Sequence, residues 1–397
     1  MEKRLGPGFV ALGVLASALA VSGLARAAPQ QPPETCGDGV CDSGESWRAC
    51  PDDCGLRARL RRRVQQRLRE RVESRRAGGA AAGRGDHVYS LTHDGRQRTY
   101  LVHVPPSYDG RRPAPVVIVL HGGSGNAQGM QRMTLMNQAA DRHGFLAVYP
   151  QGTGPQLLGK TLGSWNAEQC CPKAVDEHVD DVGFIAAMLE QLASDVAIDR
   201  SRMYATGHSN GAMLSYRLAC ELSEQIAAIA PVGAQVQLSN CAPTRPVPVI
   251  HFHGTDDPCA LYDGGPACGG CMAAHFTRTL HKEVEVHTWP CESVPDHIAR
   301  WRAINGVLDA SHVTVQHGQS TCVTYGSDTP GEVTLCTIQG MGHTWPGGTY
   351  GPACDKPESK NCQSFMQAIG SLSDDLNADE VMWEFFQRHP LPERTRP

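Results

Sequence analysis

Long hydrophobic runs are scarce in this 397-residue chain, and the longest lies at its start. Sixteen almost uncharged residues extend from Phe9 to Leu24, fewer than the roughly 20 that a membrane-spanning helix needs. They follow a basic start and precede Ala25-Arg26-Ala27, a small-x-small cleavage pattern. This predicts a signal peptide over residues 1–27. The alternative, a membrane anchor, fits the short run less well, and no later segment resembles a membrane span.

Positive charge is not in excess either. The formal net charge is −5, although residues 55–85 hold eleven Arg against two Glu. The other 25 Lys and Arg and 39 Asp and Glu residues leave the rest of the chain at −14. Such an acidic body disfavours nucleic acid as the main ligand.

Cysteine, by contrast, is abundant, with 16 residues. A cytosolic protein rarely keeps so many thiols, whereas an oxidising compartment converts them into disulfides. With the signal peptide, this predicts a secreted protein, and a periplasmic or cell-surface location would also fit. The spacing makes Cys220–Cys241 and Cys322–Cys336 plausible bridges, while Cys170 and Cys171 either bond to each other or pair separately.

A Cys-rich acidic mini-domain is predicted over residues 28–54. Four cysteines lie among acidic residues and glycines there, so two disulfides must replace a hydrophobic core. Asp38, Asp42 and Glu45 could supply oxygen ligands to Ca²⁺, although no complete EF-hand loop is present. The alternative is a disulfide-stapled spacer with solvated carboxylates. Zinc on four thiolates is disfavoured in an exported chain.

An Arg-rich helix and a Gly/Ala linker are predicted over residues 55–85. Apolar residues recur at every fourth position from Leu56 to Val72, which places them along one side of a basic helix. This helix could lie on an anionic surface. We favour a solvated spacer, because the apolar side is narrow and has no aromatic residue.

The main domain is predicted over residues 86–392 and has the pattern of an α/β fold. Near-continuous apolar strands alternate with helical patterns, which indicates a mostly parallel sheet with helices on both faces. A hairpin at His93-Asp94-Gly95 adds antiparallel strands at the edge. The predicted strands are 99–104, 116–120, 145–149, 203–206, 226–231, 247–253 and 332–338, and the predicted helices are 130–143, 182–196 and 211–222.

The segment Gly207-His-Ser-Asn-Gly211 matches G-x-S-x-G, in which a strand turns sharply into a helix and exposes the serine. The pattern alone is weak, because chance often supplies it. Here a strand pattern precedes it and a helix pattern follows it, as the motif requires. Ser209 is therefore the candidate nucleophile of an α/β-hydrolase fold.

A serine nucleophile needs a histidine base and an acid, which follow it in this order in that fold. Asp256 and Asp257 come just after the strand that ends near His253, and His343 lies in a Gly-rich loop after a later strand. His251 and His253 alternate with apolar residues and are predicted to pack or form hydrogen bonds instead.

Two further motifs complete the candidate site. The glycine loop at residues 121–125 follows a strand, and we assign oxyanion donors to the backbone amides of Gly123 and Asn210. The alternative for the loop is an ordinary turn. Asp180 and Asp181 precede a helix and are predicted to cap it rather than to catalyse.

Together these segments resemble the secreted esterases that include polyhydroxybutyrate depolymerases and feruloyl or acetylxylan esterases. The resemblance covers Val88 to Pro390, 303 of the 397 residues. The matching segments are HGGSG at His121, SWNA at Ser164 with Cys170-Cys171, VDDVGF at Val179, GHSNG at Gly207, HGTDD at His253, GMGHTWPGG at Gly340 and WEFF at Trp383.

The resemblance has implications for single residues. It selects Asp257 over Asp256 as the catalytic acid, and it suggests that Trp165 and Trp345 line the substrate cleft. Without it, both tryptophans fit a hydrophobic core equally well. The chain departs from the family pattern in the cysteine-containing loops at residues 259–271 and 354–362, which leaves the substrate open.

We therefore predict a secreted serine carboxylesterase that forms an acyl-enzyme on Ser209 and requires no cofactor and no metal in the catalytic domain. Its substrate is a polymeric or small ester, either a polyhydroxyalkanoate-type polyester or feruloyl or acetyl esters of plant polysaccharide. The alternatives are a serine peptidase and a non-catalytic surface-binding or adhesion protein on a hydrolase scaffold. The oligomeric state is left open.

Overall fold

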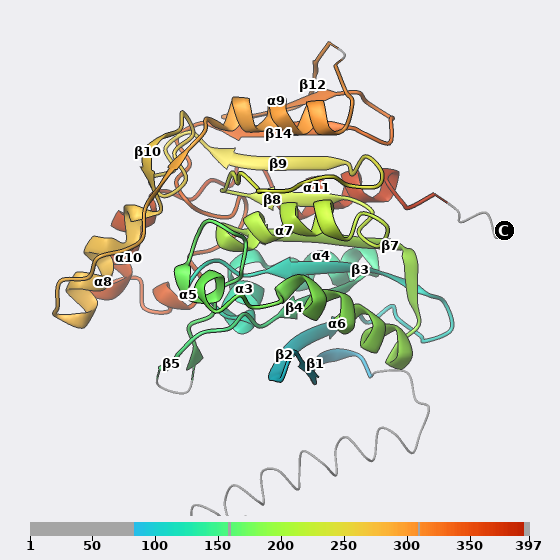
Figure 1. Cartoon of the computed structure of the whole chain (residues 1–397), viewed down its shortest axis with the longest axis horizontal. Helices are drawn as coiled ribbons and strands as arrows, with labels where there is room; N and C mark the ends of the chain where they lie inside the picture. Colours follow the sequence, from blue (N-terminus) through green and yellow to red (C-terminus); the bar gives the residue numbers. More distant parts are fainter. Residues whose placement is uncertain (1–82, 158–159, 309, 393–397) are drawn as a thin grey trace, which may run out of the picture. The chain divides into compact units, whose positions relative to one another are not determined.

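The computed structural model describes residues 83–392 except 158–159 and 309 (Figure 1). The predicted signal peptide, the Cys-rich mini-domain with its candidate calcium ligands and nearly all of the Arg-rich helix and linker lie outside the described residues. Among the helices that are described, none combines the length and the apolar character needed to cross a bilayer.

A ten-stranded sheet forms the centre of the described domain, in the order β1-β2-β4-β3-β7-β8-β9-β14-β13-β12. The strands from β4 to β14 in that order run parallel, and the strands at both edges are antiparallel. This confirms the predicted mostly parallel sheet. The strands are β1 Gly85–His93, β2 Arg96–Val104, β3 Ala114–Leu120, β4 Leu146–Pro150, β7 Ile198–His208, β8 Ile229–Val232, β9 Val249–Gly254, β12 His312–His317, β13 Ser320–Tyr325 and β14 Val333–Ile338.

The predicted hairpin at the N-terminal edge is present between β1 and β2. Asp94 and Gly95 both have positive φ, 48° and 68°, as a two-residue turn between right-twisted strands requires. In the centre of the sheet, every residue of β3 is buried, which explains its continuous apolar sequence.

Helices cover both faces of the sheet and enclose two hydrophobic cores. The α6 and α7 helices pack on one face, and the α3, α4 and α11 helices contribute to the core on the other. Figure 1 shows α6 and α7 in front of the sheet and α4 and α11 behind it. The helices are α3 Ala127–Thr134, α4 Met136–His143, α5 Pro172–Asp176, α6 Asp181–Asp195, α7 Asn210–Glu221, α8 Ala273–Leu280, α9 Val294–Ile304, α10 Lys360–Ile369 and α11 Ala378–Arg388.

The predicted helix over residues 130–143 is wrong in one respect, because two helices occupy that region. Leu135 has a φ of 61° and separates α3 from α4. The cause is local: the hydroxyl of Thr134 accepts a hydrogen bond from the backbone N–H of Met136 and donates one to the carbonyl of Met130. These side-chain bonds replace the regular helical pattern at that turn.

A small set of segments lies beyond the end of the sheet to which the β9 arrow points (Figure 1). It contains α8 and α10, which contact each other, and the two-stranded sheet of β10 and β11. The remaining short elements are β5 Gln156–Leu157, β6 Lys160–Thr161, β10 Gly265–Cys268, β11 Trp289–Cys291, η1 Gly270–Met272 and η2 Gly351–Cys354.

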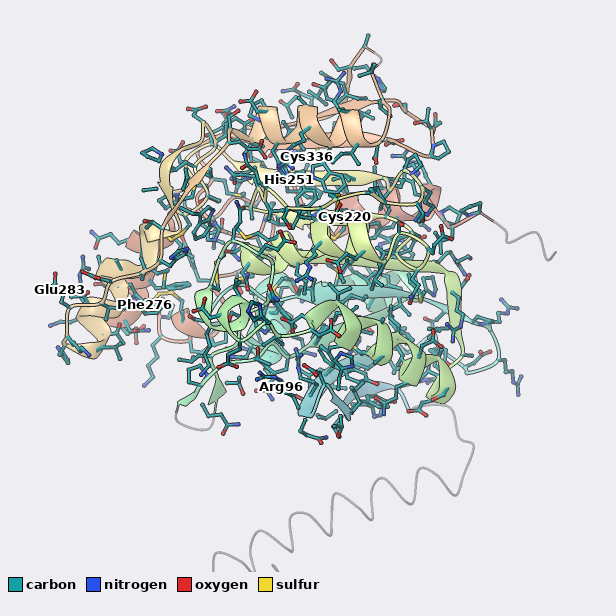
Figure 2. All side chains as sticks on the ribbon, in the orientation of Figure 1. Arg96, Cys220, His251, Phe276, Glu283 and Cys336 are labelled. Atoms are coloured by element: carbon teal, nitrogen blue, oxygen red, sulfur yellow. A yellow bond between two sulfur atoms is a disulfide. The ribbon has the colours of Figure 1, made fainter. Side chains whose placement is uncertain are left out.

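All twelve cysteines of the described residues form disulfides. The predicted bridges Cys220–Cys241 and Cys322–Cys336 are confirmed, and Figure 2 labels one cysteine of each. Cys170 and Cys171 bond to each other, which settles the alternative in favour of the vicinal disulfide. The other bridges are Cys259–Cys271, Cys268–Cys291 and Cys354–Cys362.

An ion pair in the interior joins β2 to the start of α6. Arg98 donates to Asp181 Oδ1 at 2.7 Å, and both side chains are almost completely buried. The predicted cap is therefore correct for Asp180, whose carboxylate accepts the N–H of Gly183, but not for Asp181. Asp181 instead accepts hydrogen bonds from Arg98 and from the backbone of Asn166.

Breaking this pair from one side should destabilise the fold strongly. We expect Arg98→Met to lower the free energy of unfolding by about 3–5 kcal/mol, because it leaves the Asp181 charge buried without an opposite charge to pair with. Combining it with Asp181→Leu should recover much of the loss. Arg200→Met, which breaks an exposed pair with Glu190, should cost less than about 1 kcal/mol. Urea unfolding measures all three, and equal losses for the two single variants would contradict the interpretation.

Candidate active site

Ser209 lies between the end of β7 and the start of α7, on a sharply turned backbone. Its φ of 55° and ψ of −121° are unusual for a residue other than glycine. The two flanking glycines make this turn possible. A Cβ atom on Gly211 would lie 2.6 Å from the carbonyl oxygen of His121, and one on Gly207 would lie 2.5 Å from the backbone of Gly211. The structure thus has the strand-turn-helix geometry that the motif predicts.

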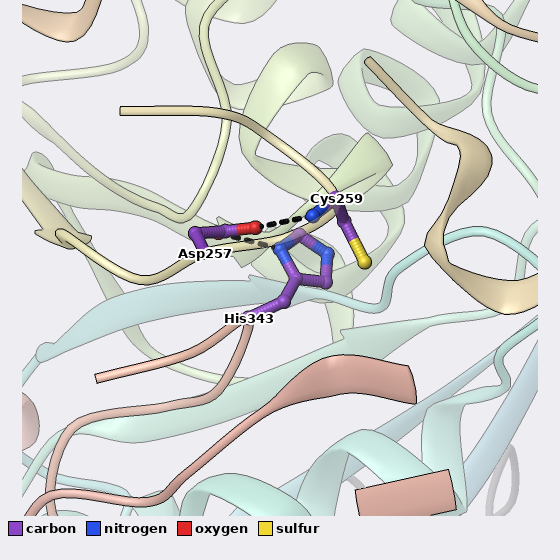
Figure 3. Close-up of side chains that lie close together, drawn as sticks. All are labelled: Asp257, Cys259 and His343. Atoms are coloured by element: carbon purple, nitrogen blue, oxygen red, sulfur yellow. Dashed lines mark hydrogen bonds and ion pairs between the residues drawn. The ribbon is translucent and has the colours of Figure 1, made fainter. Parts of the chain in front are cut away.

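Asp257 and His343 meet at the same end of the sheet, although 86 positions separate them. Asp257 follows β9, His343 follows β14, and Oδ2 of the acid lies 2.7 Å from Nδ1 of the imidazole (Figure 3). Asp256 is exposed and bonds to Thr255 instead. The structure therefore brings Asp257, and not its neighbour, to the histidine.

The Asp257 carboxylate is fully buried, and each of its oxygens has a partner. Oδ1 accepts the backbone N–H groups of Cys259 at 2.8 Å and Ala260 at 2.7 Å, and Oδ2 faces His343. Burial alone would raise the pKa of Asp257. The charge and hydrogen bond of His343, with smaller contributions from His253 and Ala260, outweigh that effect and hold the pKa below its usual range. The group is thus an anion at neutral pH.

Ser209 and His343 both border His208. The imidazole rings of His208 and His343 have centroids 4.5 Å apart, and His208 directly precedes Ser209. A Cβ atom on Gly233 would lie 3.4 Å from both Asp257 Oδ2 and His343 Nδ1 and 3.6 Å from His208 Nε2. Ser209 and His343 share no hydrogen bond in the described part of the chain, and such contacts are often longer before substrate binds.

The glycine loop after β3 lies directly against Ser209. A Cβ atom on Gly122 would be 3.3 Å from Cβ of Ser209, and the next residue, Gly123, is exposed. Asn210 begins α7, where backbone N–H groups have no partner within the helix. Its side chain is held in place by the backbone of Trp165, with bonds of 2.7 Å and 3.1 Å. Asn210 directly follows Ser209 in the chain, and a Cβ atom on Gly123 would lie 3.9 Å from Cβ of Asn210, so the two predicted oxyanion donors lie close to each other.

Trp165 and Trp345 require a correction. Both side chains are fully buried, so neither can line an open substrate cleft. Trp165 donates to the carbonyl of His121 beneath the glycine loop, and Trp345 donates to Asp379 in the second hydrophobic core. The alternative reading, in which both tryptophans are core residues, is the one that the structure supports.

Two neighbours of the site were not assigned from the sequence. His208 is buried, and burial holds its pKa well below its usual value, so that the ring beside His343 is neutral. The Cys170–Cys171 disulfide also borders the site, because a Cβ atom on Gly123 would meet Sγ of Cys171. For His208, its place inside the G-x-S-x-G motif was a signal that could have been used.

One cluster of possible metal ligands coincides with this site. Atoms of Asp257, Cys259 and His343 lie within 4.8 Å of one another. However, the sulfur of Cys259 forms a disulfide with Cys271, and the side chains of Asp257 and His343 form a hydrogen bond with each other. The donor set therefore does not suit a metal ion.

Comparison with known proteins finds esterases among the relatives of this chain. The family profile described as Esterase PHB depolymerase matches residues 98–312, more than half of the chain, a range that includes Ser209 and Asp257. The putative esterase NocK of Nocardia uniformis subsp. tsuyamanensis is 30% identical over 269 residues, which are 64% of this chain and 73% of that protein. Feruloyl esterase B of Piromyces equi is 29% identical over 265 residues, 64% of this chain and 44% of that protein.

Among solved structures, the acetyl xylan esterase from Aspergillus awamori is similar with a TM-score of 0.45 and 16% identity. The alignment covers 65% of this chain and 94% of that structure.

The Trp345–Asp379 contact gives a prediction about pH and stability. Burial raises the pKa of Asp379 to about 8, even though the hydrogen bond from Trp345 acts in the opposite direction. The folded state thus holds a proton that the unfolded chain releases near pH 4, so the stability from this group is complete below about pH 4 and is lost as the pH rises through about 8.

Asp379→Asn keeps an acceptor for Trp345 but cannot ionise. We expect it to be more stable than the wild type at pH 8, by roughly 2–4 kcal/mol, and to differ little below pH 4. Urea unfolding at a series of pH values provides the measurement. The same decline with pH in both proteins would show that Asp379 is not the group responsible.

Proposed function

Since the chain belongs to the esterase PHB depolymerase family, and is therefore an esterase, we propose that it hydrolyses carboxylic esters through an acyl-enzyme on Ser209. The observation that carries the proposal is the hydrogen bond of 2.7 Å between the buried Asp257 and His343, beside the turn that bears the serine. A buried carboxylate in this position fixes the tautomer of the imidazole, so that Nε2 is free to accept a proton.

The proposed reaction has two steps. Ser209 Oγ attacks the ester carbonyl while His343 takes the hydroxyl proton, and the oxyanion accepts hydrogen bonds from the amides of Gly123 and Asn210. The intermediate then expels the alcohol, which receives the proton from His343. In the second step, water attacks the acyl group with His343 as base, the carboxylic acid leaves and the serine hydroxyl is restored. This route requires no cofactor.

A polymer or a bulky ester is the substrate that we propose. Ser209 is half-buried and Gly123 is exposed, so the nucleophile is open to a chain that does not enter a deep pocket. Relatives bear the names feruloyl esterase and acetylxylan esterase, which supports feruloyl or acetyl esters of plant polysaccharide. A polyhydroxyalkanoate-type polyester is the rival within the family.

Export is part of the proposal. Six disulfides in the described domain support an oxidising, extracellular environment. Family membership favours an esterase over the non-catalytic adhesion protein considered from the sequence.

Loss of the serine hydroxyl should abolish the reaction. We expect Ser209→Ala to lower kcat on p-nitrophenyl acetate by at least about 10⁴-fold, and Asp257→Asn by roughly 10³–10⁴-fold. The wild type should also be labelled by one equivalent of an organophosphonate at Ser209. Ser194→Ala, at an exposed position on α6, serves as the control with unchanged activity. Full activity in Ser209→Ala would refute the mechanism.

Substrate choice can be measured directly. We expect ethyl ferulate to be cleaved with a higher kcat/KM than amorphous polyhydroxybutyrate or a peptide amide, with p-nitrophenyl acetate as the reference for general esterase activity. Release of ferulate, hydroxybutyrate or amine is followed in each case. Faster depolymerisation of polyhydroxybutyrate would assign the rival substrate, and efficient amide cleavage would favour the peptidase alternative.

A further inference from the structure

A row of hydrogen-bonded side chains extends from α7 to the acid of the proposed triad. Tyr216 Oη lies 2.8 Å from His251 Nδ1, and His251 Nε2 lies 2.9 Å from His253 Nδ1. At its far end, His253 Nε2 lies 2.7 Å from the carbonyl oxygen of Ala260. We call Tyr216, His251 and His253 the buried row; none of the three has exposed surface, and Figure 2 labels His251.

The acceptor at the end of the row determines the position of every proton in it. A carbonyl oxygen can only accept, so His253 carries its proton on Nε2 and accepts at Nδ1. His251 must then donate from Nε2 and accept at Nδ1, where the hydroxyl of Tyr216 donates. Burial lowers the pKa of both histidines, so each ring is neutral and has one donor and one acceptor in use.

The row ends at Asp257 by two routes. His253 Nε2 lies 3.5 Å from Asp257 Oδ2, so the N–H directed at Ala260 also turns the positive end of its dipole toward the carboxylate. In addition, Ala260 accepts from His253 through its carbonyl and donates to Asp257 Oδ1 through its N–H. His253, on β9, thus fixes the position of Ala260, and Ala260 in turn holds the carboxylate of Asp257.

Aromatic and histidine side chains pack around the buried row and restrict the movement of its rings. His251 is next to His297 on α9, with ring centroids 6.0 Å apart, and His297 is paired with Glu292 at 2.8 Å. The rings of Tyr216 and Trp301 stack at 4.8 Å. Packing from α7 and α9 thus leaves the imidazoles little freedom to rotate.

We propose that His253 is a positioning residue for the esterase reaction: through its N–H and through Ala260 it holds Asp257 against His343, and His251 and Tyr216 fix its tautomer. The inference rests on the proposed function, because it assumes that Asp257 acts on His343 in catalysis. Without this support, the carboxylate would lose the His253 N–H near Oδ2 and the fixed position of the Ala260 N–H that donates to Oδ1.

The test is a double-mutant cycle with kinetics. We expect His253→Phe to lower kcat about tenfold with KM nearly unchanged, His251→Phe to lower it less and Tyr216→Phe least, since each is one step farther from Asp257. In the Asp257→Asn background, His253→Phe should change kcat by less than about twofold, because a residue that acts through the acid has nothing left to position.

A structural role alone would give another pattern. His389→Phe, the same change at another buried histidine, should destabilise the protein without lowering kcat. In the wild type, proton NMR should show a low-field signal from the His343 N–H that faces Asp257, and this signal should shift or broaden in His253→Phe but not in His389→Phe. His253→Gln retains a donor for Ala260 and should restore part of the rate; it also replaces the phenylalanine variant if that one does not fold.

Two results would overturn the proposal: an unchanged kcat in His253→Phe, or an equal loss with and without the Asp257 carboxylate. Neither would touch the esterase mechanism, which fails only if Ser209→Ala or Asp257→Asn retains full activity.

Discussion

The backbone turn at Ser209 is the constraint on which the rest of the site depends. A residue with φ of 55° is held there because β7 hydrogen-bonds to strands on both sides and α7 begins at the next residue. The carbonyls of Leu120 and His121 pass so close to Gly211 that any side chain at that position would collide with them. The turn and the glycine loop are therefore one packed unit, and neither can move without the other.

Parallel strands supply the second part of the arrangement. Because β3, β7, β9 and β14 run in the same direction, the loops that follow them all emerge at the end of the sheet where the strands have their C-termini. The glycine loop, Ser209, Asp257 and His343 each follow one of these strands. Segments that lie far apart in the sequence thus meet at the same end of the sheet. The buried apolar side chains of the strands fix the positions of these loops.

Much of this could be predicted from the sequence, because the signals are local. The strand and helix patterns around residues 207–211 specify the turn, and the Asp94-Gly95 pair specifies the hairpin. Other features depend on side chains that meet only in three dimensions. Asp256 and Asp257 are chemically identical neighbours, so the choice between them came from the family resemblance. The break at Leu135 depends on two hydrogen bonds of Thr134, and the burial of Trp165 and Trp345 depends on the partners His121 and Asp379. The proposed catalytic roles of Ser209, Asp257 and His343 stay predictions.

The disulfides next to the acid have a consequence for sequence variation. Cys259 lies two residues after Asp257, and Cys268 joins Cys291 across β10 and β11. The segment between these bridges, including α8, is closed covalently at its base, whereas Asp257 is held by β9 and by the backbone N–H groups of Cys259 and Ala260 at the first bridge. Insertions or exchanges within that segment would be mechanically insulated from the acid. Evolution can thus diversify this segment while the proposed proton-transfer groups, Asp257 and His343, stay in place.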